Sequence, residues 1–237
     1  MQFKYLPLSK TQEAEGVVVV IDVLRAFTTA AYAFSIGAEK IYPVGSIKEA
    51  IRLKDQIPGS LIMGEEKGFK PDGFDFGNSP SKIIKQDLSN STLIQRTSAG
   101  TQGLMRAQSN KTLIAASFVV AKATGEYLYR LAPEMVSFII TGNSLGRDGD
   151  EDQACAEYIA GLIRNKNPHP EKFTKRILTS TVGQSFVKGE IHYLSEKDLI
   201  LSGQVNLFDF VMVVSKEKDL LVMGPKYSKG KNPNWHG

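Results

Sequence analysis

The run VVVVID at residues 17–22 constrains the fold more than any other stretch of the sequence. Valine and isoleucine fill it up to Ile21, so both faces of a strand formed here are apolar. Such a strand is typical of the centre of a sheet that is covered on both sides. The next residues, 24–37, place apolar side chains at helical spacing and end at Gly37, where a helix can stop. The sequence therefore predicts a buried strand followed by a crossover helix.

The same alternation of strand and helix continues along the chain. Ser46 and Glu49 form a capping-box pattern that predicts a helix running to about Gln56. Further helices are expected over 151–164 and over 195–203, the latter capped by Ser195, whereas residues 165–192 give no clear prediction. Strands are expected in the opening segment and at 40–44, 60–64, 92–97, 111–117 and 135–142, with a terminal hairpin at 209–215 and 219–224.

This order of elements predicts an α/β fold with three layers, α/β/α. The central sheet is expected to be largely parallel or mixed, and the chain is expected to have a C-terminal hairpin. Because the chain has 237 residues and no clear linker, we expect residues 1–237 to form a single domain.

The composition excludes several classes of protein. Hydrophobic residues make up 42% of the chain and charged residues 23%, which is ordinary for a globular protein. The single cysteine, Cys155, excludes an internal disulfide framework and fits a reducing compartment, so we expect a cytoplasmic protein. No stretch approaches the roughly 18 apolar residues of a membrane span, and the opening segment has the pattern of a strand rather than of a signal peptide. We therefore expect no membrane partner.

The net charge of +4 does not indicate a nucleic-acid partner, because much of it lies at one end of the chain. Residues 216–237 hold five lysines against Glu217 and Asp219, a local charge of +3 that leaves +1 for the remainder. A basic tail of this kind is usually a solvated end, and no basic face interleaved with aromatic residues occurs elsewhere.

Polar residues cluster directly after the predicted strands. In open α/β sheets, ligands bind outside the carboxyl ends of the strands, so these residues are the first candidates for a site. The candidates are Asp22, Arg25, Thr28 and Thr29 after the first run; Glu65, Asp75, Asn78 and Ser79 after 60–64; Arg96, Thr97, Ser98, Gly100 and Thr101 at 92–101; and Arg147, Glu151 and Asp152 after 135–142.

The residue types in this set indicate two kinds of chemistry. Turns rich in serine, threonine and glycine, together with arginines, suit a phosphate or a carboxylate. Carboxylates without matching histidines suit a hard cation such as Mg²⁺. Found together on one edge of a sheet, they predict a magnesium-assisted site for an anionic phosphoester.

Each candidate also has a purely structural interpretation. Asp22 is well placed to cap the following helix, and the acids of residues 150–152 suit the start of a helix dipole. Cys155 is typical of a small buried hydrophobe. The phosphate-binding patterns GxxxxGK[ST] and GxGxxG are both missing from the sequence. From the residues alone, the prediction stops at an α/β protein with an anion and metal site.

Six blocks of the chain, in order, resemble the 2-phosphosulfolactate phosphatases, the ComB-like proteins of coenzyme M synthesis. VVVVIDVLRAFTTA resembles VVIDVLRATTT, GEEKGFKPDGFDFGNSP resembles GER-G-K-P-GFDLGNSP, and RTSAGTQGL is similar to TTNGT-RAL. ASFVVAKA is similar to GSFLNA, GRDGDEDQACA to GR-G-SLEDLLCA, and LSGQVNLFDFVMVV to a closing pattern around DRFDFVPVV. The resemblance spans residues 17–214 and implies a three-layer α/β fold and a Mg²⁺-dependent phosphatase that converts 2-phosphosulfolactate to 3-sulfolactate and phosphate.

The resemblance and the strand-end positions coincide on most candidates, and we assign their roles as hypotheses. The catalytic residues would be Asp22, Arg25 and Asp152. The Mg²⁺ ligands would come from Asp22, Glu65, Asp75, Glu151 and Asp152. Substrate binding would involve Thr28, Asn78, Ser79, Thr97, Ser98, Gly100, Thr101 and Arg147.

The chain departs from the family pattern at several positions. Glu66 stands where GER has arginine, Ala99 replaces the asparagine of TNGT, Gln102 replaces the arginine after it, and Gly149 stands where SLED has serine. These changes remove two cations and one amide, so the reaction class carries over better than the substrate. The alternative prediction is a non-catalytic binding protein for a small phosphorylated or carboxylated anion. A homo-oligomer is the default expectation for a metabolic enzyme of this size.

Overall fold

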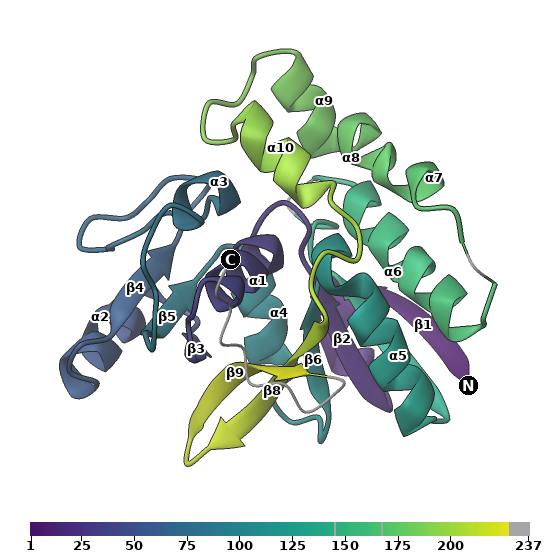
Figure 1. Cartoon of the computed structure of the whole chain (residues 1–237), viewed down its shortest axis with the longest axis horizontal. Coiled ribbons are helices and arrows are strands. Elements are labelled where there is room, and N and C mark those ends of the chain that lie inside the picture. The colour runs from purple at the N-terminus through teal and green to yellow at the C-terminus, as the bar shows by residue number, and fades with distance from the viewer. Residues whose placement is uncertain (145, 167, 228–237) are drawn as a thin grey trace.

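The computed structural model describes residues 1–144, 146–166 and 168–227 (Figure 1). Within these residues the strands are β1 (Gln2–Pro7), β2 (Val17–Ile21), β3 (Lys40–Pro43), β4 (Leu61–Gly64), β5 (Thr92–Arg96), β6 (Leu113–Ala116), β7 (Met135–Ile140), β8 (Phe210–Glu217) and β9 (Leu220–Tyr227). Every strand expected from the sequence is present, and the mixed α/β class is confirmed.

Helices follow most of the strands, as the alternation predicts. They are α1 (Ala26–Ser35), α2 (Ile47–Gln56), α3 (Pro80–Ile83), α4 (Gly100–Arg106), α5 (Ala121–Leu131), α6 (Asp150–Ile163), α7 (Glu171–Thr174), α8 (Arg176–Thr179), α9 (Thr181–Val187) and α10 (Glu196–Ser202), with two 3-10 turns, η1 (Leu8–Glu13) and η2 (Phe118–Val120). Ser46 caps α2 by accepting the backbone N–H of Glu49, and Ser195 forms a full capping box with Asp198. Both predicted caps are confirmed.

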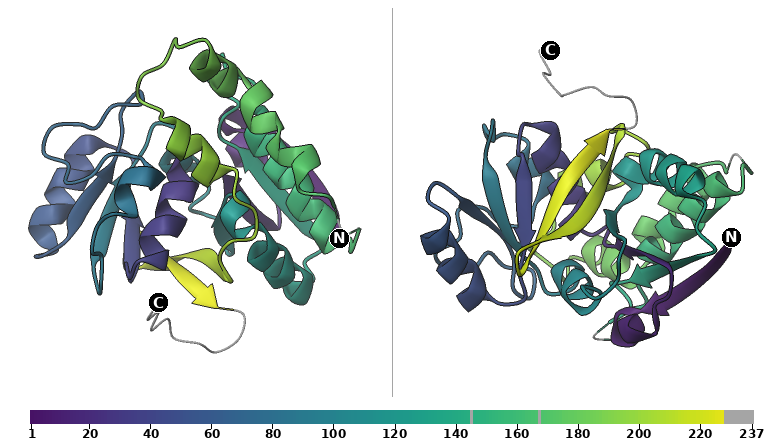
Figure 2. Two further views of the ribbon diagram at one scale, coloured as in Figure 1. Left: turned by 45° about the horizontal axis from the view of Figure 1, so that its top comes forward. Right: turned by 90° about the horizontal axis from the view of Figure 1, so that it is seen from below.

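The strands form one mixed sheet in the order β1-β7-β2-β6-β8-β9-β3-β5-β4. Strands β1, β7, β2 and β6 are parallel to one another, and so are β3, β5 and β4. The C-terminal hairpin β8–β9 is confirmed, but it is not an edge. It lies between the two parallel blocks and pairs antiparallel with β6 on one side and β3 on the other. Figure 2 shows the yellow hairpin crossing the middle of the molecule.

Alternate side chains of each strand enter two different cores, because strand side chains point to opposite faces in turn. In β2, Val18 and Val20 pack with α1 and α4, whereas Val17, Val19 and Ile21 pack with α5 and α6. Helix α2 covers the second face at β3, β4 and β5. The prediction of a β2 covered on both sides is confirmed, since each of its residues is buried.

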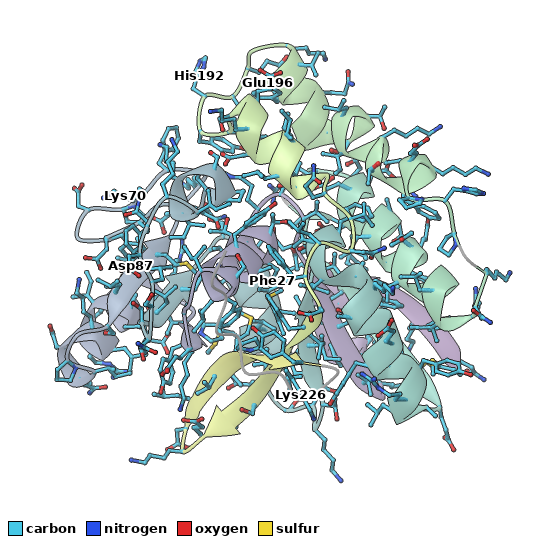
Figure 3. The ribbon with its side chains drawn as sticks, viewed as in Figure 1. Phe27, Lys70, Asp87, His192, Glu196 and Lys226 are labelled. Atoms are coloured by element: carbon cyan, nitrogen blue, oxygen red, sulfur yellow. The ribbon has the colours of Figure 1, made fainter. Side chains whose placement is uncertain are left out.

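The packing separates the interior from the charged periphery. Phe27 of α1 is fully buried, whereas Lys70, Asp87, His192 and Glu196 are exposed, and Figure 3 shows these labelled side chains. Residues 165–192, which gave no clear prediction, form the short helices α7, α8 and α9 in their described part. Together with α10 these helices gather along the upper edge of Figure 1.

No helix in the described ranges combines the length and the apolar character that a bilayer crossing requires. The last ten residues of the basic tail, 228–237, lie outside the described residues.

Candidate active site

A cavity of about 480 Å³ lies where the chain leaves the carboxyl ends of several strands. Asp22 and Arg25 reach it from the end of β2, Glu65 from the end of β4, Arg96 from β5, and Arg147 from the loop after β7. Val182 of α9 with Tyr193 and Leu194, which precede α10, closes one side. The remaining wall residues are Leu24, Glu66, Lys67, Gly68, Asn78, Ser98, Ala99 and Gln102.

Asp22 caps the helix that follows it and also lies on the wall of the cavity. Its Oδ1 accepts the backbone N–H of Ala26 at 2.9 Å and so holds the start of α1. Burial raises the pKa of Asp22, and the negative charge of Glu65 adds to the increase, whereas the Ala26 N–H and the charge of Arg147 act in the opposite direction. The carboxylate is therefore a buried acid on which a compensating positive charge would have a large effect.

Asp152 and Glu151 lie behind this wall rather than on it. Asp152 accepts the N–H groups of Val23 and Gly142, both at 2.7 Å, and thereby ties the loop after β2 to the loop after β7. Glu151 Oε2 is buried and has no hydrogen-bond partner among the described residues. Burial, and then the charges of Asp148 and Asp22, raise the pKa of Glu151 to about 7.

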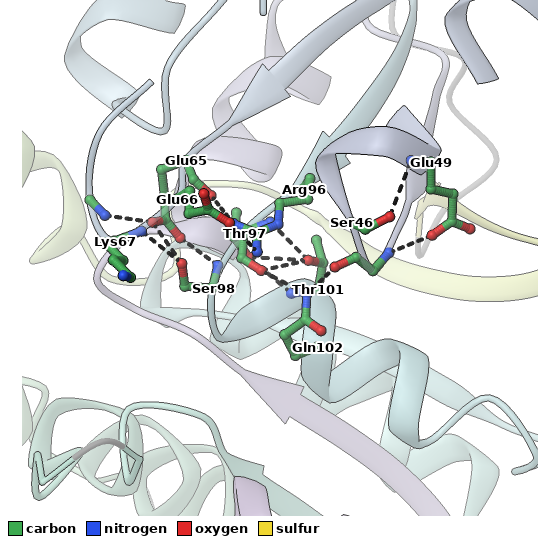
Figure 4. Close-up of polar contacts among 12 residues, drawn as sticks. Ser46, Glu49, Glu65, Glu66, Lys67, Arg96, Thr97, Ser98, Thr101 and Gln102 are labelled. Carbon is green, nitrogen blue, oxygen red and sulfur yellow. Dashed lines mark hydrogen bonds and ion pairs between the residues drawn. The ribbon is translucent and has the colours of Figure 1, made fainter. Parts of the chain in front are cut away.

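Glu65 is fixed by the turns around it (Figure 4). Its Oε1 accepts the N–H of Ser98 at 2.6 Å, and its Oε2 accepts the N–H of Gly68 at 2.6 Å and the hydroxyl of Ser98 at 3.0 Å. These bonds tie the loop after β4 to the loop after β5. The charged carboxylate is thus oriented by the backbone before any ligand arrives.

Arg25 is held by a buried carboxylate from α10. Its Nη1 donates to Asp198 Oδ2 at 2.8 Å, and its guanidinium lies 5.7 Å from the centre of the Tyr193 ring. Asp198 also accepts the hydroxyl of Ser79 and the N–H of Ser81. Although burial alone would raise the pKa of Asp198, these hydrogen bonds and the charge of Arg25 lower it below its ordinary value. The pair therefore stays ionised and fastens α10 to the loop after β2.

Two further arginines bring positive charge to the wall. The Arg147 guanidinium donates to the Ser144 hydroxyl at 3.2 Å, and its charge acts on the pKa of Asp22. Arg96 Nη1 donates to the carbonyl of Glu65 at 2.8 Å, and its Nη2 lies 3.1 Å from Glu66 Oε1. The cavity therefore has one cation near Asp22 and another beside the loop after β4.

Several residues predicted to bind substrate or metal have other contacts. The Thr97 hydroxyl accepts the N–H of Thr101, and the Thr101 hydroxyl accepts that of Thr97, so these two shape the turn before α4. Thr28 donates to the carbonyl of Val23, and Ser79 to Asp198. None of these four is among the wall residues. Gly100 is also off the wall, and its backbone approaches so closely that an added Cβ would lie 2.6 Å from the Cβ of Ala26 and 2.8 Å from Asp22 Oδ2.

Asp75 is the predicted metal ligand that the structure separates from the others. Its Oδ2 accepts Lys54 Nζ and the N–H of Ile62, each at 2.7 Å, and it borders a neighbouring cavity rather than the one with Asp22. Cys155, which also falls in a family block, is fully buried in α6, and burial raises the pKa of its thiol well above the ordinary value of 9.0. That is the environment of a packed hydrophobe, not of an activated nucleophile.

The carboxylates on the cavity wall include two that could hold a divalent cation. In the described chain, no group of three or more His, Cys, Asp or Glu side chains is arranged to hold a metal ion by itself. Asp22 and Glu65, however, both line the cavity. Mg²⁺ is usually bound through one or two carboxylates together with water and substrate phosphate oxygens. The pair on the wall fits that mode of binding.

Known proteins resemble this chain over most of its length. Residues 5–217 match the 2-phosphosulpholactate phosphatase family. The chain belongs to this family. A Bacillus subtilis (strain 168) protein is 36% identical over 204 residues, which cover 85% of this chain and 88% of the relative.

Two further relatives match at different levels of identity. A Carboxydothermus hydrogenoformans protein is 47% identical over 155 residues, covering 65% of this chain and 63% of the relative. A Clostridium acetobutylicum protein is 26% identical over 220 residues, covering 90% of each chain. All three relatives carry the name "Probable 2-phosphosulfolactate phosphatase". Membership makes the chain a phosphatase, so the enzyme class expected from the sequence is confirmed.

The sequence gives no signal for the partners that hold the predicted residues in place. Asp198 lies in the predicted helix capped by Ser195, and its bond to Arg25 spans 173 positions of the chain. Tyr193 lies in a segment that gave no prediction. For Arg96, the last residue of β5, nothing in the sequence indicates that Glu65 and Glu66 come to lie beside it.

Proposed function

We propose that this family member hydrolyses the phosphomonoester of 2-phosphosulfolactate to give 3-sulfolactate and phosphate, and that the reaction depends on Mg²⁺. One observation carries the proposal: two buried carboxylates, Asp22 and Glu65, share a cavity of about 480 Å³ with the guanidinium groups of Arg25, Arg96 and Arg147. The names of the relatives supply the substrate. A place in coenzyme M synthesis and a cytoplasmic location are part of the proposal.

The charges in the cavity suit a small, multiply charged acid. Arginine guanidinium groups form paired, charge-assisted hydrogen bonds with phosphate, sulfonate and carboxylate oxygens. Arg147, whose charge already acts on Asp22, is the cation we assign to the phosphoryl group. Arg25 presents its guanidinium to the same cavity while Asp198 fixes its direction. The phosphate would thus meet cations that do not have to rearrange.

Asp22 and Glu65 are the residues that would hold Mg²⁺ in the loaded enzyme. The ion would neutralise charge on the transferring phosphoryl group and position it for in-line attack. Glu65 is oriented for this by its bonds to Gly68 and Ser98. Asp152 would act as a positioning residue, because it holds the backbone at Val23 next to Asp22.

Phosphate release by the purified protein tests the proposal. We expect release from 2-phosphosulfolactate with Mg²⁺ and little release in EDTA. Asp22→Asn, which keeps an oxygen for the Ala26 N–H, should lower kcat by at least about 100-fold with little change in Tm. Glu15→Gln, which alters only an exposed ion pair with Lys4, is a matched control and should behave as the wild type.

Two outcomes would contradict the proposal in different ways. Equal phosphate release in EDTA would remove the metal while keeping the hydrolysis. A folded protein that binds the substrate without releasing phosphate would favour the non-catalytic binding protein instead.

A further inference from the structure

Arg96 and Glu66 form an ion pair, and both residues line the cavity (Figure 4). Arg96 is the last residue of β5, and its side chain is 13% exposed. Its Nε is buried and has no hydrogen-bond partner in the described part of the chain. A guanidinium has five N–H donors, and the contacts of Arg96 with Glu65 and Glu66 leave donor capacity unused.

Glu66 differs from its partner because its side chain is 50% exposed. Its backbone is fixed by reciprocal hydrogen bonds with Phe69, at 2.9 and 3.1 Å, that close a tight turn. The carboxylate can therefore leave Arg96 without any change in this turn. An ion pair with one exposed partner typically contributes only about 0–1 kcal/mol, so an acid group of a substrate already held in the cavity by its phosphate can replace Glu66 at small cost.

The cavity holds Arg96 and Arg147 at separate places on its wall, so the two cations can bind different groups of one substrate. Arg147 supplies positive charge at Asp22, whereas Arg96 supplies it at the loop after β4, where Lys67 also lines the wall. A substrate with a phosphate and a second acid group would meet one cation at each end. A substrate with the phosphate alone would leave Arg96 on Glu66.

We propose that Arg96 determines specificity by binding the second acid group, a sulfonate or a carboxylate, of a small phosphorylated acid, and that Glu66 is its displaceable counter-ion. The proposal rests on the phosphatase function proposed above. It also gives the glutamate at position 66 a role, since this side chain partly neutralises Arg96 until the second acid group of a bound substrate takes its place. The guanidinium of Arg96 then replaces a cation that the family pattern places on residue 66.

Paired substrates separate this role from a structural one. 2-Phosphosulfolactate carries acid groups beside its phosphate, whereas glycerol 2-phosphate has a three-carbon chain with the phosphate alone. For Arg96→Gln we expect KM for phosphosulfolactate to rise roughly 10- to 100-fold, as for a lost charge-assisted hydrogen bond. KM for glycerol 2-phosphate should change less than about 3-fold, and Arg96→Lys should be intermediate because it loses paired geometry.

Glu66→Gln gives the opposite and more diagnostic result, because the residue is exposed and its loss leaves folding intact. We expect KM for phosphosulfolactate to fall by about 2- to 5-fold, as for removal of a competing exposed ion pair, and KM for glycerol 2-phosphate to stay unchanged. The control is Glu217→Gln, which removes an equally exposed carboxylate from Lys40, at the amino end of β3 and outside the wall of the cavity. It should leave both substrates unaffected.

The proposal would be overturned if Arg96→Gln raised KM equally for both substrates, or if Glu66→Gln raised KM for phosphosulfolactate. If the wild type is active, either result contradicts the role proposed for Arg96 and leaves the proposed phosphatase function intact. If the wild type releases no phosphate, the proposed function fails separately. Calorimetry with 3-sulfolactate then decides the role of Arg96: weaker binding by Arg96→Gln and tighter binding by Glu66→Gln support it, and equal affinities overturn it.

Discussion

Arg25 and Arg96 both line the cavity and each pairs with a carboxylate, but the two pairs are built in opposite ways. In the Arg25–Asp198 pair the side chains are 5% and 2% exposed, and Asp198 accepts further bonds from Ser79 and Ser81. In the Arg96–Glu66 pair they are 13% and 50% exposed. The first joins segments 173 positions apart, whereas the second joins the end of β5 to the loop after the neighbouring strand β4.

The two pairs differ in the burial of their side chains, and burial determines whether an ion pair holds its neighbours in place or can be exchanged for a ligand. A buried pair whose remaining hydrogen-bonding groups are satisfied holds its neighbours in position, since separating the charges leaves one of them in a medium that solvates it poorly. A half-exposed pair stores little energy and can be exchanged. The side of the cavity held by Arg25 and Asp198 is therefore rigid, whereas the side with Arg96 and Glu66 can rearrange when a ligand binds.

The largest effect is expected from breaking the buried pair. Asp198→Asn keeps the shape and leaves Arg25 without its counter-charge, so the free energy of unfolding should fall by about 3–5 kcal/mol. Urea denaturation measures this. The double variant Arg25→Met with Asp198→Leu should recover part of the stability, because it removes the unpaired charge but also the bonds of Asp198 to Ser79 and Ser81, and it should not recover the activity. A loss below 1 kcal/mol for Asp198→Asn would mean that both pairs are of the exchangeable kind.

Gly100 tests how closely the fixed side is packed. In Gly100→Ala the new Cβ would lie 2.6 Å from Ala26 Cβ and 2.8 Å from Asp22 Oδ2, so we expect a loss of about 1–3 kcal/mol and reduced kcat. At Gly45 an added Cβ would have its nearest neighbour, Glu49 Oε2, at 3.6 Å. Gly45→Ala is thus the matched control. Equal Tm values for the two variants would contradict the close approach.

Glu151 is a buried carboxylate of a third kind, because no described residue gives its Oε2 a hydrogen bond. Its pKa rises from 4.5 to about 7 on burial, so the folded state binds a proton that the unfolded state releases over this range. Its contribution to stability is therefore fully present below pH 4.5 and is lost as the pH rises to 7. In EDTA, Glu151→Gln should reduce this decline in the free energy of unfolding by up to about 1.4 kcal/mol per pH unit. Unfolding curves at pH 5, 6 and 7 check it, and parallel curves for variant and wild type would refute it.

The smallest effect on stability is expected at the exchangeable pair. Glu66→Gln should change the free energy of unfolding by less than about 1 kcal/mol, and added salt should reduce even that difference. Thermal unfolding at low and high ionic strength measures it. A loss as large as that of Asp198→Asn would show that exposure does not distinguish the two pairs.

Much of the fold follows from local patterns. The VVVVI run determines a central strand because only a doubly covered strand buries both of its faces. Ser46 and Ser195 determine helix starts through bonds that span three residues. The hairpin is local too, but its place between β6 and β3 is not, because strand pairing depends on partners distant in sequence.

The α/β class, the family and the set of polar residues at the strand ends all follow from sequence patterns. Which of these residues share the cavity depends on the folded chain: Asp22, Glu65 and Arg147 lie on its wall, whereas Thr97 and Thr101 bond to each other and Asp75 bonds to Lys54. It also supplied Asp198 to Arg25 and Glu66 to Arg96. The physical reason is that helix and strand signals act over a few residues, whereas burial and charge pairing depend on segments that only folding brings together.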